Sequence, residues 1–299
     1  MNIRDLKYLI AVADHNHFGR AAEACFVSQP ALSMQIKKLE GSLGVLLIER
    51  SNKRVFFTEI GKLIVQQARD ILYRVETLQE IANQSKDPFC GELHLGIIPT
   101  LAPYLLPLII PGLSTLFPKL TLYLVEETTL NLLTKLNEGK LDGALLALPT
   151  EGDFSVSPLF DEEFVLAVPF EHPLAKQKTA NFSDLENKTL LLLEDGHCLR
   201  DQALAVCHRA NASESKNFRA TSLETLRHMV SAGVGITLMP KLSCRSNDGV
   251  CYLPFTSSIP MRTIGFIWRE STAKKILLEH LVDHIKTVTQ ANLSKCSEE

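Results

Sequence analysis

The fold of the N-terminal part of the chain is decided by one stretch, Phe18-Gly-Arg-Ala-Ala-Glu-Ala-Cys-Phe-Val-Ser-Gln-Pro-Ala-Leu-Ser-Met-Gln-Ile-Lys-Lys-Leu-Glu40. Ala21 and Ala22 are small enough to let a first helix approach the next one closely. Ser28 is a good N-cap residue for a second helix, and a proline is tolerated in the turn that follows it. The stretch therefore predicts a helix-turn-helix. Such units commonly have a glycine in the turn, whereas this chain has Phe26, so the geometry of the turn is left open.

The second predicted helix has an apolar face and a polar face. Leu32, Ile36 and Leu39 recur at helical spacing and are expected to point inward. The outward face carries short polar groups first and cations later, as base-edge contacts followed by phosphate contacts require. Its residues are Ser28, Gln29, Ser33, Met34, Gln35, Lys37 and Lys38. We expect DNA contacts from Ser28, Gln29, Pro30, Ser33, Gln35 and Lys37.

The segments on either side complete this unit. A helix is predicted upstream, from about Ile3 to Asp14. After Gly44 the chain reads Val-Leu-Leu-Ile-Glu-Arg-Ser-Asn-Lys-Arg-Val-Phe-Phe-Thr, which predicts two short strands joined by a basic turn. This is a wing, in which Arg50, Lys53 and Arg54 are expected to bind backbone phosphate. The alternative is a three-helix packing unit with a solvated hairpin.

Composition and charge limit the class of protein. The chain has 299 residues, 45% hydrophobic and 22% charged, which is typical of a soluble protein with room for two domains. Residues 1–58 carry eight Lys and Arg against five Asp and Glu, a net of +3, and residues 88–299 carry nineteen against twenty-four, a net of -5. The basic end is therefore the end to test for nucleic acid.

The apolar runs and the cysteine count indicate the cellular compartment of the protein. No apolar run reaches the roughly 18 residues of a membrane span, and the amphipathic start does not look like a signal peptide. Seven cysteines, an odd number, fit a reducing compartment better than a secreted disulfide framework. We expect a cytoplasmic protein in which any disulfide is transient.

A long connecting helix is predicted from Glu59 to Lys86, where no proline intervenes. Its apolar residues are spaced four, three, four, three and four apart, which is a heptad seam. They are Ile64, Ala68, Ile71, Val75, Leu78 and Ala82. The seam packs either against its own domain or against a second copy of the chain. Asp87-Pro88 then ends the helix and marks a boundary.

The rest of the chain alternates between strand-like and helical segments. Strands are predicted at Glu92–Ile98, Leu120–Val125 and Gly143–Leu148, with helices at Pro103–Phe117 and Thr129–Glu138 between them. This alternation predicts a parallel sheet in an α/β domain, with sites at the carboxyl ends of the strands.

The pattern then repeats and doubles back, which predicts two lobes with a cleft. The later elements are strands at Glu163–Val168, Thr189–Leu193 and Arg262–Trp268 and helices at Ser222–Ala232 and Lys274–Thr287. The tail from Gln290 is expected to be solvated. We find no phosphate-binding glycine loop, zinc-protease helix or Gly-x-Ser-x-Gly elbow, so no enzyme is predicted.

One stretch offers redox chemistry: Leu190-Leu-Leu-Leu-Glu-Asp-Gly-His-Cys-Leu-Arg-Asp-Gln-Ala-Leu-Ala-Val-Cys207. Cys198 has His197 and Arg200 beside it and is expected near a helix N-terminus, a setting that favours a reactive thiolate. If the segment from Leu199 to Cys207 is helical, the two thiols are roughly 13.5 Å apart along its axis and on opposite faces. A disulfide needs Cα atoms within about 7 Å, so their pairing requires the helix to unwind.

Two other interpretations of these cysteines stay open. Free cysteines are commonly small buried hydrophobes. A metal site formed by His197, Cys198, Cys207 and His208 is the weaker alternative, because its wide gap matches none of the usual ligand spacings.

The N-terminal residues carry a family resemblance. The run Phe18–Glu40, together with Leu43-Gly-Val-Leu-Leu-Ile-Glu-Arg50 and Thr58-Glu-Ile-Gly61, resembles the winged N-terminal domain of LysR-type bacterial transcription regulators. The resemblance implies a winged helix-turn-helix in residues 1–58, a dimerisation helix in 59–87 and a two-lobed effector domain like the periplasmic binding proteins in 88–299.

Four later motifs narrow the resemblance to the family's peroxide-sensing members: Glu194–Ala203, Phe218–Arg227, Gly235–Leu238 and Arg262–Gly265. It implies that Cys198 reacts with peroxide and that Cys207 resolves the product as a reversible disulfide. The resemblance also implies a peroxide pocket. The residues expected to line or support this pocket are Thr100, Thr129, His197, Arg200, Asp201 and Arg262. His208 departs from the pattern, since relatives have a bulky apolar residue there, and the C-terminal helix matches poorly.

The resemblance also implies the protein's partners and role. The implied partners are double-stranded DNA, hydrogen peroxide as the signal, further copies of the chain in a dimer or tetramer, and RNA polymerase. No cofactor, metal or membrane is expected. The implied role is to activate oxidative-stress genes. The main alternative is a LysR-type regulator that responds to a small metabolite in the effector cleft. A thiol peroxidase is a further alternative, against which the helix-turn-helix argues.

Overall fold

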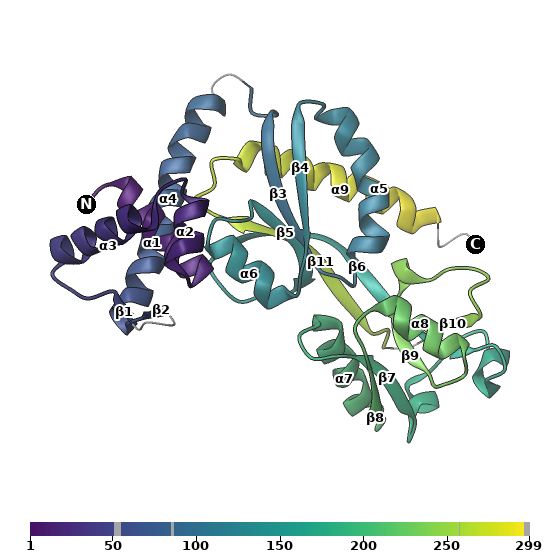
Figure 1. Cartoon of the computed structure of the whole chain (residues 1–299). Helices are drawn as coiled ribbons and strands as arrows, with labels where there is room; N and C mark the ends of the chain where they lie inside the picture. The colour runs from purple at the N-terminus through teal and green to yellow at the C-terminus, as the bar shows by residue number, and fades with distance from the viewer. Residues whose placement is uncertain (51–54, 85–86, 257, 296–299) are drawn as a thin grey trace. The chain divides into compact units, whose positions relative to one another are not determined.

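The structure is a computed structural model that describes residues 1–50, 55–84, 87–256 and 258–295. The chain divides into two compact units, Met1–Asp87 and Pro88–Glu299. Figure 1 shows helices and a small hairpin in the first unit and a mixed sheet covered by helices in the second. Within the described residues, no helix is long and apolar enough to cross a membrane.

The first unit is a winged helix-turn-helix. Its elements are α1 (Ile3–His15), α2 (Phe18–Ala24), α3 (Gln29–Leu43), β1 (Ile48–Arg50), β2 (Val55–Phe57) and α4 (Glu59–Gln84). The expected Ser28 cap is present, since its Oγ accepts a hydrogen bond from the backbone N–H of Ala31 at 3.4 Å. The expected inward residues of α3 are buried: Leu32, Ile36 and Leu39. The two predicted strands form an antiparallel pair.

The turn between α2 and α3 has the geometry of a Schellman motif. The N–H of Val27 donates to the carbonyl of Ala22, and the N–H of Phe26 donates to that of Glu23, both at 3.0 Å. This arrangement requires a left-handed residue after the helix, and Phe26 adopts it with φ +55°. Phe26 therefore occupies a position that usually belongs to glycine, and its ring is 97% exposed.

The predicted heptad seam lies on α4, and its two halves differ in how far their side chains are buried. The first half packs on its own unit, where Val65 and Ala68 are buried and Ile64 is partly buried. In the second half, Ile71 is 41% exposed and Leu78 is 67% exposed. Among the seam side chains whose burial is described, those of the first half hold α4 to its own unit, and Ile71 and Leu78 are exposed.

The second unit contains a seven-stranded mixed sheet and a separate two-stranded sheet, with the strand orders β10-β6-β11-β5-β3-β4 (β9 paired with β6) and β7-β8. The strands are β3 (Gly91–Ile97), β4 (Leu120–Glu126), β5 (Gly143–Leu148), β6 (Phe154–Pro169), β7 (Thr189–Leu193), β8 (Ser213–Ala220), β9 (Thr237–Pro240), β10 (Val250–Pro254) and β11 (Met261–Arg269). The helices are α5 (Ala102–Leu116), α6 (Thr129–Asn137), α7 (Cys198–Arg209), α8 (Leu223–Ser231) and α9 (Lys275–Lys295), with short 3-10 turns η1 (Pro173–Lys176), η2 (Phe182–Leu185) and η3 (Lys241–Ser243).

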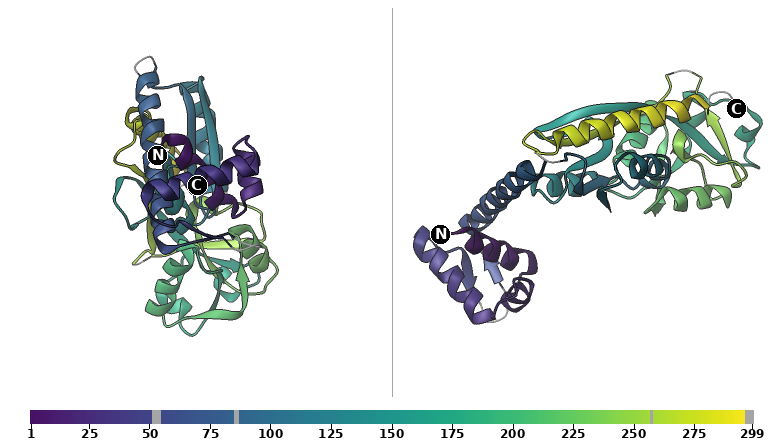
Figure 2. Two further views of the ribbon diagram at one scale, coloured as in Figure 1. Left: turned by 60° about the vertical axis from the view of Figure 1, so that its left-hand side comes forward. Right: turned by 90° about the horizontal axis from the view of Figure 1, so that it is seen from above.

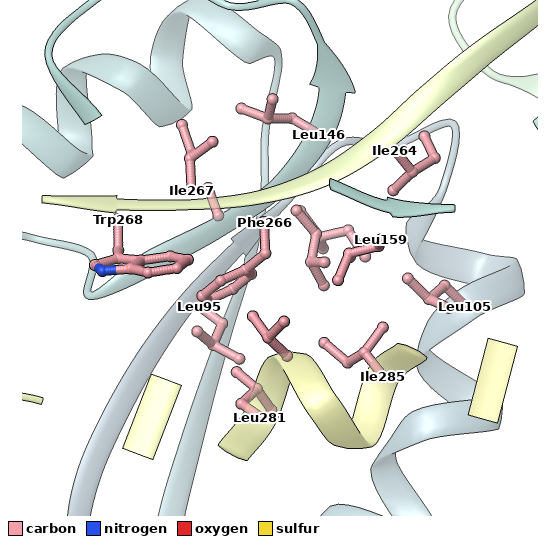
Figure 3. Close-up of a cluster of buried hydrophobic side chains, with 14 of the residues drawn as sticks. Leu95, Leu105, Leu146, Leu159, Ile264, Phe266, Ile267, Trp268, Leu281 and Ile285 are labelled. Atoms are coloured by element: carbon pink, nitrogen blue, oxygen red, sulfur yellow. The ribbon is translucent and has the colours of Figure 1, made fainter. Parts of the chain in front are cut away.

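This unit has two lobes, each with its own core. Buried side chains of β3, β5, β11, α5 and α9 form the core of the first lobe, part of which Figure 3 shows around Phe266, Leu95 and Ile285. In Figure 2, α9 (yellow) lies along the sheet of this lobe. Two further clusters form the second lobe, around Leu166 and Phe164. The strand β6 belongs to both, because Leu159 and Phe160 join the first core and Phe164 joins the second.

The structure corrects two sequence expectations in this unit. The sheet is mixed rather than parallel, since β3 pairs in parallel with β4 and β5 while β6 and β11 run antiparallel to their neighbours. The closing helix is longer than expected, because α9 continues to Lys295 instead of ending at Thr287, while Gln290 and Ala291 are exposed, in line with the expected solvated end. Strand direction depends on how the chain returns between lobes, which the alternation of segments does not encode.

The left-handed Phe26 gives a first prediction. Replacement of Phe26 by glycine should raise the free energy of unfolding by about 1 kcal/mol, because a side chain with a Cβ is strained at this φ and the exposed ring contributes little packing. Urea unfolding monitored by circular dichroism measures the difference. Phe26→Ala is the matched control, since it removes the ring but keeps the Cβ, and should change stability little. Equal stabilisation by both variants would contradict the explanation.

Candidate functional site

Cys198 is the first residue of α7 and lies where the two lobes meet. It belongs to the second lobe by sequence, yet its half-buried side chain packs against the core of the first lobe. The preceding Gly196 has φ +96°, and a Cβ built there would lie 3.8 Å from Thr128 in the first lobe. The distance to Thr128 would allow a side chain, but the positive φ favours glycine, and the turn at Gly196 leads the chain into α7 at Cys198.

Cys207 lies near the other end of the same helix, in a different environment. It is 2% exposed and belongs to the core of the second lobe. Burial, with a smaller contribution from the nearby carboxylate of Glu214, raises the pKa of its thiol to about 11. No disulfide joins any of the cysteines that the structure describes.

The expected helix between the two cysteines is confirmed. Because α7 is continuous from Cys198 to Arg209, the two cysteines are nine helical steps apart, or roughly 13.5 Å along the axis. Nine steps of about 100° also place them on opposite faces. The two sulfur atoms therefore cannot bond while this helix is intact.

Arg200 anchors the first turn of α7 instead of pointing at an open site. Its guanidinium donates to both carboxylate oxygens of Glu214, at 2.5 and 2.9 Å, and to Asp195 at 2.8 Å. A fourth hydrogen bond goes to the carbonyl oxygen of Leu193 at 3.2 Å. The hydrogen bond from Arg200 lowers the pKa of Glu214, so the pair stays ionised at neutral pH. This bidentate pair connects α7 to β8.

Thr129 supplies an unpaired hydroxyl on the first-lobe side of this junction. It is the first residue of α6 and directly follows Thr128, which lies against Gly196. Its Oγ1 is buried and has no hydrogen-bond partner among the residues that the structure describes. A buried hydroxyl without a protein partner is usually paired with a water or a ligand, so Thr129 can hydrogen-bond a small oxygen-containing molecule here.

Arg262 and Thr100 belong to a fully buried ion-pair network. Arg262 on β11 faces Glu162 on β6 in the sheet register, and their side chains are 2.7 Å apart with 0% exposure. The guanidinium also donates to Thr100, to its hydroxyl at 2.9 Å and to its carbonyl at 3.2 Å. The other oxygen of Glu162 accepts the backbone N–H of Leu242 at 3.1 Å. The network therefore fixes Thr100 at the carboxyl end of β3.

The two remaining residues expected at the peroxide pocket, His197 and Asp201, differ in exposure. His197 is the N-cap residue of α7 and is 8% exposed. Asp201 is in the first turn of α7 and is exposed. Glu162 and Glu214 were not expected from the sequence, although each is the carboxylate partner of an expected arginine. Glu162 stands in the acidic run Asp161-Glu-Glu163, and sequence gives no sign of which member is buried.

The DNA-binding residues expected on α3 have different degrees of exposure. Ser28, Gln29, Pro30 and Lys37 are exposed, whereas Ser33 and Gln35 are half-buried. In the wing, Lys53 and Arg54 and the side chain of Arg50 lie outside the described residues. The described part of the chain contains no cluster of His, Cys, Asp or Glu that could hold a metal ion.

Comparison with known families assigns the chain to a class. The model of bacterial regulatory helix-turn-helix proteins of the lysR family matches residues 3–62, and the LysR substrate binding domain matches residues 86–290. The chain belongs to the LysR family of bacterial transcription regulators.

Within that family the chain is similar to hydrogen peroxide regulators. It is 51% identical to the "Hydrogen peroxide-inducible genes activator" of Dickeya chrysanthemi over 99% of both chains. It is 50% identical to the "DNA-binding transcriptional dual regulator OxyR" of Escherichia coli K12, over 99% of this chain and 98% of that one. A full-length OxyR variant from Pseudomonas aeruginosa has a similar structure, with a TM-score of 0.79, 38% identity and coverage of 96% and 95%. These relatives are regulators and not enzymes.

The two cysteine environments predict different reactivities. With iodoacetamide at pH 8, Cys207 should be alkylated about 100-fold more slowly than Cys198 in the native protein, because its thiol is buried and its pKa is about 11. Time-resolved peptide mass spectrometry measures both rates. In urea the two rates should become similar, which is the internal control. Comparable rates in the native protein would show that Cys207 is not held in the core.

Proposed function

We propose that this chain is a DNA-binding transcription regulator that senses hydrogen peroxide through a reversible Cys198–Cys207 disulfide and activates oxidative-stress genes. The observation that carries the proposal is the position of two unlike thiols at opposite ends of one short helix. Cys198 lies at the junction of the lobes, and Cys207 is buried in a core. The whole-length similarity to peroxide-inducible gene activators supports the same function.

Peroxide binds, in this proposal, between the loop before α7 and the first turn of α6. The unpaired hydroxyl of Thr129 supplies a hydrogen bond that peroxide oxygen satisfies. Thr100 is held in place by Arg262, and the buried His197 closes the site beside Cys198. Arg200 does not contact peroxide in this proposal, and it positions the first turn of α7 through its ion pair with Glu214. The exposed Asp201 contributes charge at the N-terminal end of the helix, near the site's edge.

The first chemical step oxidises Cys198. Its thiolate attacks one peroxide oxygen, the O–O bond breaks, and the products are a sulfenic acid and hydroxide, which takes up a proton to become water. Cys207 does not compete for peroxide, because its raised pKa keeps it a thiol and its burial excludes the oxidant.

The second step requires the helix to open. Cys207 must leave the core and lose its proton before it attacks the Cys198 sulfur, which forms the disulfide and releases water. Because the sulfurs are on opposite faces of α7, bond formation melts the helix and disturbs its contacts with β7 and β8. This gives the effector unit two alternative states, as an allosteric regulator needs.

The first unit binds DNA in this proposal. With α3 in the major groove, Ser28, Gln29, Pro30, Ser33 and Gln35 approach base edges and Lys37 approaches phosphate, with Arg50, Lys53 and Arg54 of the wing as further phosphate contacts. The exposed second half of α4, with Ile71 and Leu78, supports pairing with a second copy. We propose a dimer or tetramer that acts on RNA polymerase in the cytoplasm.

Footprints of the reduced and peroxide-treated protein on DNA test the redox proposal. Peroxide should change the wild-type footprint and should leave those of Cys198→Ser and Cys207→Ser unchanged. Cys251→Ser is the matched control, a half-buried cysteine on β10 that should respond like wild type. Mass mapping should show the peptides of Cys198 and Cys207 joined, with a loss of two hydrogens. A Cys207→Ser protein that responds like wild type would refute the disulfide step.

Salt dependence of binding tests the role assigned to Lys37. Lys37→Ala should weaken binding to all duplexes alike and reduce the slope of log affinity against log salt by about 0.9 for each bound copy of the chain, as expected for one lost phosphate contact per copy. Lys7→Ala is the control, because Lys7 is an exposed lysine of the same unit on α1. Equal slopes for Lys37→Ala and wild type would remove Lys37 from the phosphate contacts.

A further inference from the structure

The DNA-binding face of α3 exposes a large apolar side chain. Met34 is 57% exposed, although the opposite face of the same helix buries Leu32, Ile36 and Leu39. Pro30 and Ala31, four and three residues earlier, are also exposed. Residues at these spacings are neighbours on a helix surface, so the three form an apolar strip, Pro30-Ala31-Met34.

This strip has no evident role in folding. Met34 is not part of the core of the first unit, which the inward face of α3 helps to form. An exposed methionine adds nothing to stability by burial, and large apolar groups on a surface commonly mark an interaction site. The strip should therefore be covered in the complex that this face forms.

Charge around the strip indicates what covers it. Lys37 and Lys38, three and four residues after Met34, are exposed and present cations on the same side of the helix. A partner that matches both features needs an apolar group beside a negatively charged backbone. In the major groove of duplex DNA, the 5-methyl group of thymine is the apolar group on the base edges, and phosphates border the groove.

We infer that Met34 is a specificity-determining residue that contacts a thymine methyl group in the operator. This inference rests on the proposed DNA-binding function and names the base feature that this site reads. Its neighbours Ser33 and Gln35 are half-buried, so Met34 projects farther from α3 than they do. Its unbranched thioether side chain adapts to the shape of a methyl group, whereas the polar residues of the face pair with hydrogen-bonding edges.

The test compares thymine with uracil, which has the same pairing groups but no methyl. A duplex site is first selected from a random pool with the full-length reduced protein. Each thymine of the selected site is then replaced in turn by uracil, and dissociation constants are measured by fluorescence anisotropy. At one thymine of each half-site, the replacement should weaken wild-type binding about fourfold, the factor that corresponds to one buried methyl group.

Variants assign that effect to Met34. Met34→Ala should bind the thymine duplex about fourfold more weakly per half-site and should no longer distinguish uracil at that position. Met34→Leu keeps an apolar side chain of similar volume and should retain the discrimination. Met261→Ala is the matched control, because Met261 is a similarly exposed methionine, 52% accessible, on β11 of the second unit.

The outcomes separate this inference from the proposed function. If the wild-type protein selects no duplex, the DNA-binding proposal itself fails. If it selects a site but uracil replacement has no effect, or Met34→Ala discriminates as wild type does, the role of Met34 is refuted and DNA binding stands.

Discussion

The buried ion pair between Arg262 and Glu162 is the interaction on which the second unit depends. It joins β11 to β6 where β6 passes from one lobe to the other, and neither side chain is exposed. Each charge is satisfied by further groups, Thr100 on one side and the N–H of Leu242 on the other. Loss of one partner would leave an uncompensated buried charge, which typically costs about 3–5 kcal/mol. The pair and its hydrogen bonds therefore hold β6, β11 and Thr100 together at the junction of the lobes.

The helix α7 depends on a different set of tertiary contacts, which lie at its two ends. Its first turn is tied to β8 by the pair of Arg200 with Glu214, and its last turns are held by the burial of Val206 and Cys207. A helix of 12 residues is marginal by itself, so these tertiary contacts decide whether it persists. A covalent bond between its two ends competes with those contacts directly. The proposed switch thus combines a lobe junction joined by a fully buried ion pair with a short helix that depends on its tertiary contacts.

Much of this arrangement was predictable because it depends on neighbours in sequence. The cap at Ser28, the inward residues of α3 and the helix between the two cysteines all follow from local spacing and were confirmed. The unusual Phe26 was recognisable as a departure, but only the structure shows that it adopts the left-handed geometry of glycine. The mixed sheet and the continuation of α9 to Lys295 were missed, since strand direction and helix docking depend on contacts between distant segments.

By itself, the sequence determined the order of elements, the helical separation of Cys198 from Cys207 and the residues that face inward on α3. These depend on the period of the helix and on local capping, which act over a few residues. Only the tertiary structure decided that Arg262 pairs with Glu162 and that Arg200 pairs with Glu214. It also decided that the buried hydroxyl of Thr129 has no hydrogen-bond partner among the described residues. The reason is that burial and pairing of a charge depend on which distant segments pack around it, and chain spacing carries no record of that packing.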